Sequence, residues 1–517
     1  MRIVIPAAGK SQRFKEAGFF LPKLFLPVGE KLMIEHVIEM FDQQDEFLLI
    51  ISEESRTEFN QEYEKLCSKY RNLKIAAIPS HALGPGFSIA NDKVFDFVLD
   101  SSFIVTYCDF FVEWNYKKFL EFISSTSPAG SIVSFKGLQP SSLGSTMFAY
   151  LRVFGNQVLQ VREKASFTEN RMSEFASTGI YYFANWKTYV NAFKNLNNEL
   201  PNTSERYVSL LFNYIRSAKL EVNHFEANKF VCLGTPEDYN EYLSWYNFFN
   251  NRNLSLEPQE IIVDLSILPM AGQGQRFSDA GYRLPKPFIP INSVPMFIAT
   301  LDSLPQCKEY AIITKPNFAL RVQSTLNQIR PNQQVNVEVL AESTFGPGET
   351  LLSFPKLFEE GKSLIVSSCD YEHQFSTSKF RDAIADKLID GLVFTTKFSK
   401  FRMRNPNAFA YCVEGLNREI FKIVEKKTIS DQPEEDALVV GTFWFRDAAD
   451  LRSALEDAVA NNYRVNGEIY VGTSINLLIE KGLNFRCFEV DNWISYGDPF
   501  ELDLYHWWEE LLGDEKT

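Results

Sequence analysis

The sequence predicts an α/β protein made of two similar domains in tandem, each with a mostly parallel sheet and helices on both faces. Three observations lead to this expectation. The chain has 517 residues, enough for two large domains. One set of motifs occurs twice, and β-rich runs alternate with segments of helical period throughout. Sheets of this kind bind ligands beyond the carboxyl ends of their strands.

The motifs of the first half return in the second half at an almost constant interval. Gly9 corresponds to Gly272, and Lys23 corresponds to Lys286, 263 residues apart in both cases. The interval is far too long for a solenoid, so each copy is a whole domain. We expect the first domain to span residues 1–252 and the second to span 260–517.

Each copy contains four β-rich runs before its middle. The expected strands are residues 2–5, 47–52, 74–79 and 103–107 in the first copy, and 265–269, 310–314, 335–340 and 363–368 in the second. An amphipathic helix is expected at 32–41.

Composition excludes several classes of protein. No run of about 18 apolar residues is present, so no membrane helix is expected. The N-terminus lacks the features of a signal peptide, which predicts a cytoplasmic protein. Seven cysteines without a CxxC pair argue against a disulfide framework and against structural zinc. A net charge of −14 without basic clusters disfavours a nucleic-acid partner.

The first motif is a strand followed by a small, glycine-bearing turn, an arginine and a lysine. Backbone N–H groups of such a turn can hold phosphate oxygens, while Arg13 with Lys23, and Arg276 with Lys286, neutralise a triphosphate. The sequence lacks glycines that a P-loop or a dinucleotide-binding turn would need at these positions. The plain alternative is a strand-to-helix turn with a surface arginine and lysine. The turn residues expected to contact a nucleotide are Ala7, Ala8, Gly9, Met270, Ala271, Gly272 and Gly274.

The second motif is an aspartate at the end of a strand. Asp109 and Asp370 each follow a buried run, where a magnesium ion that bridges phosphates would need an oxygen ligand. Either side chain could instead cap a following helix.

Two further motifs recur in both copies. In Glu163-Lys164 and Glu425-Lys426 the lysine could bind the phosphate of a second substrate and the glutamate a hydroxyl, or the two could form a surface ion pair. The Gly-Pro-Gly turns could let the backbone approach a base ring, or could simply turn the chain. Their glycines are Gly84, Gly86, Gly346 and Gly348.

Taken together, the motifs resemble the sugar-phosphate nucleotidyltransferases of bacterial surface-polysaccharide clusters, which have a Rossmannoid, GT-A-like fold. The resemblance spans nearly the whole chain, once per half, and implies a cytoplasmic enzyme that supplies precursors for polysaccharides such as a capsule. It implies that Gly272, Gly274, Arg276 and Lys286 bind a nucleoside triphosphate, that Asp370 holds Mg²⁺, that Lys426 contacts the acceptor phosphate, and that Glu468 and Tyr470 line the acceptor pocket. In the first half, Gly9, Arg13, Lys23, Asp109, Lys164 and Glu205 hold the same places.

The sequence departs from the family pattern at a few positions. Many relatives carry a second metal-binding aspartate where Cys232 and Ser495 stand here. A branch of the family uses an acidic residue slightly earlier, which Asp491 could supply in the second half, whereas Asn228 stands at the matching place in the first. Ser11 replaces the middle glycine of the first turn, and Asp498 replaces a threonine of the closing motif.

The expected reaction is attack by a sugar 1-phosphate or a related phosphate monoester on the α-phosphorus of a nucleoside triphosphate, with release of pyrophosphate. It requires positioning and neutralisation of charge and needs no covalent protein intermediate. One alternative is a GT-A glycosyltransferase that uses a nucleotide sugar, for which only Asp370-Tyr371-Glu372 offers a metal motif, as DxE. Another is that one copy is a regulatory nucleotide-binding module. The base, the acceptor and the oligomeric state remain open.

Overall fold

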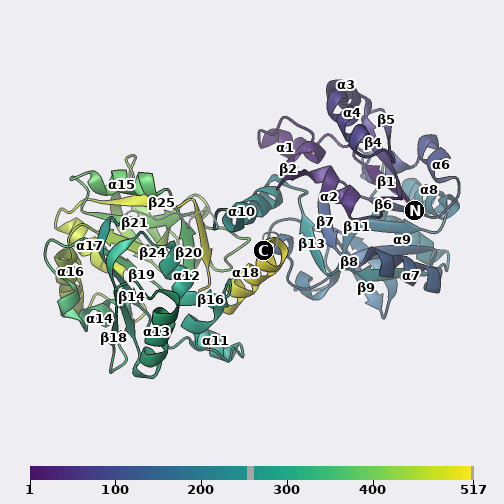
Figure 1. The fold of residues 1–517 in the computed structure, drawn as a ribbon. Coiled ribbons are helices and arrows are strands. Elements are labelled where there is room, and N and C mark those ends of the chain that lie inside the picture. Colours follow the sequence, from purple (N-terminus) through teal and green to yellow (C-terminus); the bar gives the residue numbers. More distant parts are fainter. Residues whose placement is uncertain (253–260, 514–517) are drawn as a thin grey trace. The chain divides into compact units, whose positions relative to one another are not determined.

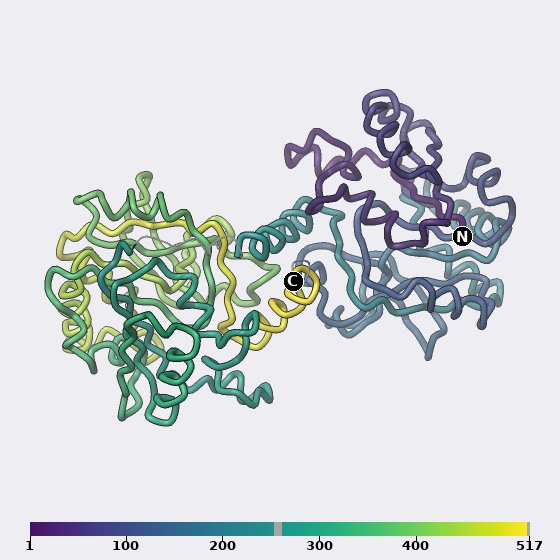
Figure 2. The backbone as a smooth tube through the Cα atoms, in the orientation of Figure 1, coloured from purple at the N-terminus to yellow at the C-terminus, as the bar shows by residue number. Residues whose placement is uncertain are grey.

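The computed structural model of the protein describes residues 1–252 and 261–513 (Figure 1). The chain forms two compact units, Met1–Ser244 and Trp245–Thr517. The division falls inside helix α10 (Pro236–Arg252), before the end of the range expected for the first copy. Figure 2 shows that the trace runs from purple to teal through one unit and from teal to yellow through the other, so each unit is formed by one continuous run of the chain.

The first unit is built on a nine-stranded sheet in the order β5-β4-β1-β6-β11-β8-β12-β10-β9. Strands β1, β4, β5 and β6 are parallel, whereas β11 runs antiparallel to β6 and β8. The strands of this unit are β1 Arg2–Pro6, β2 Pro27–Val28, β3 Lys31–Leu32, β4 Glu46–Ser52, β5 Leu73–Ile78, β6 Phe103–Thr106, β7 Phe110–Glu113, β8 Gly130–Phe135, β9 Ala149–Phe154, β10 Gln157–Glu163, β11 Phe175–Phe183, β12 Val222–Glu226 and β13 Lys229–Cys232. Its helices are α1 Gln12–Glu16, α2 Met33–Glu39, α3 Glu53–Glu58, α4 Asn60–Lys69, α5 Pro85–Ile89, α6 Asp92–Val98, α7 Tyr116–Thr126, α8 Trp186–Glu199 and α9 Val208–Ser217, followed by α10.

The second unit repeats this order of strands. Its sheet runs β18-β17-β14-β19-β24-β21-β25, and β22 pairs with both β23 and β24. The strands are β14 Val263–Pro269, β15 Pro290–Ile291, β16 Val294–Pro295, β17 Cys307–Thr314, β18 Val335–Val339, β19 Leu364–Ser367, β20 Tyr371–Gln374, β21 Gly391–Thr396, β22 Ala410–Glu414, β23 Ile420–Glu425, β24 Ala437–Phe445, β25 Phe485–Glu489 and β26 Asn492–Ser495. The helices are α11 Gln275–Asp279, α12 Met296–Ser303, α13 Pro316–Ile329, α14 Pro347–Leu352, α15 Thr377–Ala385, α16 Ala448–Ala460, α17 Val471–Glu480 and α18 Pro499–Leu512.

The α/β fold class is confirmed, and each expected strand is present within a few residues of its predicted ends. The sheets are more mixed than expected, because β11 and β24 each run antiparallel to both of their central neighbours. A strand buried on both faces is a continuous apolar run whichever way it points, so the sequence pattern does not show its direction.

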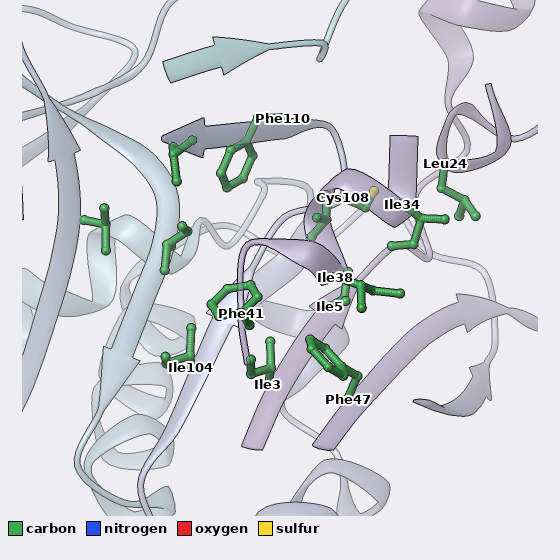
Figure 3. Packing of buried hydrophobic residues seen from close by; sticks show 14 of the residues in the cluster. Ile3, Ile5, Leu24, Ile34, Ile38, Phe41, Phe47, Ile104, Cys108 and Phe110 are labelled. Atoms are coloured by element: carbon green, nitrogen blue, oxygen red, sulfur yellow. The ribbon is translucent and has the colours of Figure 1, made fainter. Parts of the chain in front are cut away.

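Each sheet is covered by helices on both faces because its central strands are apolar on both sides. In β1, Ile3 and Ile5 face one core cluster and Val4 faces the other, and all three are fully buried. Figure 3 shows Ile3 and Ile5 with Ile38 and Phe41 of the α2 region on one of these faces. Burial of each such side chain contributes about 1.5–3 kcal/mol. These strands therefore form a fixed support for the loops at their carboxyl ends.

None of the helices in the described part of the chain has the length and apolar character needed to cross a bilayer.

Candidate functional site

The glycine-bearing turn follows β1 and β14 in the same way in both units. The N–H groups of Ala7 and Met270 still bond to the neighbouring strands, at 2.7 and 2.8 Å, so the turn begins at a fixed point. Beyond it, no acceptor among the described residues is bonded to the N–H groups of Gly9, Gly272 or Gly274. Donors of this kind can bind phosphate oxygens.

The arginine of each turn is exposed. Arg13 and Arg276 lie on the short helices α1 and α11, and neither forms an ion pair with a residue that the structure describes. Burial and the carboxylate of Glu468 raise the pKa of Tyr470, while the positive charge of Arg276 acts in the opposite direction. The arginine of the turn is therefore close enough to the acceptor motif to influence it electrostatically.

The lysine of the first motif is bound to the strand-end aspartate in both units. Lys23 Nζ lies 2.6 Å from Asp109 Oδ2, and Lys286 Nζ lies 2.7 Å from Asp370 Oδ2. Burial alone would lower the pKa of Lys286, but the carboxylate of Asp370 raises it above the ordinary value, and the same holds for Lys23 beside Asp109. Each lysine is therefore a permanent cation at the end of the central strands.

The aspartates do not cap helices. The helices that follow them, α7 and α15, are capped by Asn115 and Ser376. Asp109 and Asp370 instead stand between two strands, with one carboxylate oxygen bound to the lysine.

This arrangement fits a magnesium ion held partly by substrate. Among the described residues, no group of three or more His, Cys, Asp or Glu side chains is arranged to hold a metal ion. Magnesium is commonly bound by one or two carboxylates together with substrate phosphates. The second oxygen of Asp109 or Asp370 suits that role.

Asp491 lies away from Asp370. It stands in the turn between β25 and β26, where its N–H bonds to Gln374 O at 2.8 Å. Strand β20 separates Gln374 from Asp370, a distance of about 13 Å for four residues of strand. The two side chains are not brought together.

A different carboxylate approaches the strand-end aspartate. Glu501 Oε2 accepts a 2.6 Å hydrogen bond from Ser495 Oγ. A Cβ atom added to Gly497 would lie 3.1 Å from Glu501 Oε2 and 3.9 Å from Asp370 Oδ2. Burial raises the pKa of Glu501 to about 7. In the first unit Asp238 takes this place and contacts Cys232 Sγ. Neither carboxylate was expected from the sequence, although the spacing of Asp498 and Glu501 is that of a capping box, which the structure contains.

The lysines of the two Glu-Lys motifs share an unusual backbone conformation. Lys164 and Lys426 have φ angles of 55° and 56°, in the left-handed region that residues other than glycine rarely adopt. Strain of this kind is often stored at functional sites. Because it occurs in both units, the backbone direction of this lysine is a built feature of the fold.

Each lysine of the Glu-Lys motifs contacts residues of a distant segment of its unit. Lys164 Nζ donates to Tyr207 OH at 2.5 Å and lies 3.7 Å from Glu205 Oε2. Lys426 Nζ donates to Ala408 O at 2.5 Å and lies over the ring of Tyr470. The ion pair in the first unit is therefore formed with Glu205 and not with the neighbouring glutamate.

The glutamates that precede these lysines are largely buried. Glu163 accepts a hydrogen bond from Ser209, and burial raises its pKa. In the second unit, Gly472 stands at the position that Ser209 holds in the first unit, so it offers Glu425 no hydroxyl. Burial raises the pKa of Glu425 to about 7.

The Gly-Pro-Gly turns hold the acceptor segment. Gly86 N donates to Arg206 O at 2.7 Å, and Gly348 N donates to Ile469 O at 2.9 Å. A Cβ atom on Gly86 would lie 2.6 Å from Arg206 O. The close approach of the chain's own backbone therefore explains these glycines.

The acidic residue of the DxE sequence points away from the site. Glu372 is 5% exposed, forms an ion pair with Arg252 and accepts a 3.2 Å hydrogen bond from Tyr496 OH. Burial raises its pKa to about 7, against the effect of Arg252. Glu372 and Asp370 thus do not form a metal-binding pair.

The model of the nucleotidyl transferase family matches residues 2–246. No curated protein sequence matches the chain. Among solved structures, the chain is similar to a nucleoside-diphosphate-sugar pyrophosphorylase from Vibrio cholerae RC9, with 21% identity over 47% of this chain and 99% of that one, at a TM-score of 0.38. It is also similar to the inositol-1-phosphate CTP transferase from T. maritima, with 14% identity over 49% and 98% and a TM-score of 0.40. A UDP-glucose pyrophosphorylase complexed with UDP-glucose gives 14% identity over 49% and 100%, again at 0.40. The match of the family model lies almost entirely within the first unit and covers a little under half of the chain.

Proposed function

We propose that the protein transfers a nucleotidyl group from a nucleoside triphosphate to a sugar 1-phosphate or a related phosphate monoester and releases pyrophosphate. The observation that carries this proposal is the lysine–aspartate pair, which recurs in both units beside a glycine turn with unbonded N–H groups. We further propose that the two units are copies of one domain, and that the product is an activated precursor for surface polysaccharide made in the cytoplasm.

Separate groups of residues bind the triphosphate, the acceptor and the metal ion. The N–H groups of the turn and Arg276 bind the triphosphate, and Lys286 neutralises charge as pyrophosphate leaves. Lys426 holds the acceptor phosphate, with Glu468 and Tyr470 beside it. When bound at Asp370, Mg²⁺ would stabilise negative charge on the phosphates. The acceptor phosphate is already ionised, so the reaction needs no general base.

A second role is supported for the first unit. Ser11 has a φ of 49°, a left-handed conformation that is costly for serine, and Lys164 is partly neutralised by Glu205. Both features weaken a site for two phosphorylated substrates. The first unit would then be the slower catalyst or a regulatory nucleotide-binding module. The glycosyltransferase alternative is disfavoured because Glu372 is directed to Arg252.

The test is pyrophosphate release with Mg²⁺ across the common nucleoside triphosphates and a pool of phosphorylated sugars and polyols. Wild type, Asp109→Ala and Asp370→Ala are compared, with Asp457→Ala as a control that removes only a surface ion pair with Lys481. Release that depends on one base and one acceptor, and that is lost with Asp370→Ala, supports the proposal. A folded wild-type protein that releases no pyrophosphate with any pair contradicts it.

A further inference from the structure

The second unit begins with a segment that lies outside the second set of motifs. Residues Trp245 to Arg252, the last two turns of α10, belong to this unit by their contacts. Trp245 stacks on Trp508 of α18 with ring centroids 5.8 Å apart, and the guanidinium of Arg402 lies over the ring of Trp245, 4.9 Å from its centroid. The segment is thus packed into the unit by large aromatic side chains.

Arg252 ends this segment and enters a buried polar cluster. Its guanidinium forms an ion pair with Glu372 and donates to Tyr505 OH at 2.6 Å. Gln374, at the far end of the same strand as Glu372, donates to Phe248 O at 2.8 Å. The segment therefore holds β20 at two points.

Strand β20 begins directly after Asp370. Tyr496 N donates to Asp370 O at 2.7 Å, and Tyr496 OH donates to Glu372 Oε1 at 3.2 Å. Arg252, Glu372 and Tyr496 thus form a continuous chain of contacts that reaches the backbone of the strand-end aspartate.

The first unit fastens its corresponding strand differently. Phe111 of β7 stands where Glu372 stands, and it packs edge-on against Tyr242 at 5.9 Å and stacks on His36 at 4.9 Å. In this unit, aromatic packing takes the place of the buried ion pair. Removing one partner of a buried ion pair leaves an unpaired buried charge, whereas removing one partner of an aromatic contact does not.

We propose that Arg252 is a positioning residue for the reaction of the second unit, because its ion pair with Glu372 fixes β20 and, through it, Asp370. This inference rests on the proposed function, since it concerns the same aspartate. It implies that the catalytic part of the second unit starts at Trp245, well before the first strand of its sheet.

The experiment uses the full chain with Asp109→Ala, so that all turnover comes from the second unit. Arg252→Met, Glu372→Gln and the double variant are compared, with Arg452→Met as the control, because among the residues that the structure describes Arg452 forms an ion pair only with Glu456 on the surface of α16. We expect Arg252→Met to lower kcat about tenfold to a hundredfold, as small misplacements of reacting groups do, with the KM for the nucleotide changed by less than about twofold. Glu372→Gln added to Arg252→Met removes the unpaired charge without restoring the ion pair, so kcat should stay low; recovery of kcat in the double variant would show that the loss came from the unpaired charge and would overturn the positioning role.

A second measurement does not need turnover. Cys369 is partly exposed and precedes Asp370, whereas Cys307 of the same unit is buried. Alkylation of each cysteine by a maleimide, followed by mass spectrometry of the peptides, reports the local position of the strand end. We expect Arg252→Met to change the Cys369 rate severalfold, with Cys307 still protected, and the double variant, which also lacks the ion pair, to show the same changed rate.

The two measurements separate the possible failures. If Arg252→Met keeps both kcat and the Cys369 rate of its parent, the positioning role is wrong. If the parent protein releases no pyrophosphate, the proposed function fails, and the Cys369 rates still decide whether Arg252 fixes the strand end. If Cys307 becomes reactive together with Cys369, Arg252 supports the whole unit and not this strand, which also overturns the inference.

Discussion

Ser11 of the first unit adopts the backbone conformation that Gly274 adopts in the second. Their φ angles are 49° and 65°, and both residues stand immediately before the short helix that carries the arginine of the turn. The two turns thus have one shape, which glycine adopts without strain and serine adopts at a cost of about 1–2 kcal/mol.

The first prediction concerns these two positions. We expect Gly274→Ala to weaken nucleotide binding to the second unit about tenfold, because the new Cβ is strained and would lie 3.3 Å from Lys286 Cβ. Ser11→Gly should strengthen binding to the first unit. Isothermal titration with each nucleoside triphosphate measures both effects.

Gly482→Ala is the matched control. This glycine also has a positive φ, of 93°, and no atom lies within 4 Å of its added Cβ. It should lose stability without a change in nucleotide affinity. Equal loss of affinity in both alanine variants would contradict a specific role for the turn.

The second prediction separates the two aspartates of the second unit. Asp370→Ala should lower kcat/KM of the second unit at least about a hundredfold, because it removes the partner of Lys286 and the oxygen available to Mg²⁺. Asp491→Ala, at the other end of β20, should change it less than about twofold, as expected of an exposed surface site. Steady-state kinetics in the Asp109→Ala protein gives both numbers, and a large loss with Asp491→Ala would place a metal ligand there after all.

The third prediction concerns the acceptor. Lys426→Gln should raise the KM for the phosphorylated acceptor about tenfold and leave the KM for the nucleotide unchanged, since it removes one charge-assisted contact to phosphate. Lys422→Gln, an exposed residue of strand β23, which ends just before Lys426, should change neither constant. An effect of Lys426→Gln on the nucleotide KM alone would argue that this lysine serves the other substrate.

The fourth prediction is a pH dependence of stability. Folding raises the pKa of Glu425 from 4.5 to about 7 by burial, so the folded protein binds more protons than the unfolded protein between these pH values. The free energy of unfolding therefore falls as pH rises from about 4.5 to 7, by about 3 kcal/mol from this group. Glu425→Gln should abolish that part of the slope.

Thermal unfolding of both proteins between pH 4.5 and 8 tests the slope. Glu480→Gln, at the exposed end of α17, controls for loss of a carboxylate. Parallel curves for wild type and Glu425→Gln would show that Glu425 titrates normally in the folded protein.

Much of the fold could be predicted from the sequence because periodicity and repetition are local signals. The central strands of both sheets follow from apolar runs, and the place of the Gly9 turn and of Asp109 at one edge follows from the rule that neighbouring parallel strands end at the same edge. The antiparallel direction of β11 could not be predicted, because a fully buried strand has the same pattern in both directions.

The contacts of the carboxylates were harder to predict. Asp491 and Glu501 are both acidic residues near the closing motif, and only the pairing of β20 with β26 shows that one of them lies far from Asp370. The ion pair of Arg252 with Glu372 joins residues 120 positions apart, one of them outside the repeated motifs. No periodicity connects such residues, so only the folded chain brings them together.

The link between each Gly-Pro-Gly turn and the acceptor segment has a consequence for divergence between the two units. Its hydrogen bonds use the main-chain oxygens of Arg206 and Ile469, and the two buried side chains at this position differ completely in charge. The side chains of this segment can therefore change in evolution without loss of these main-chain hydrogen bonds. The glycines have no such freedom, and a lineage that changes its acceptor would be expected to keep them.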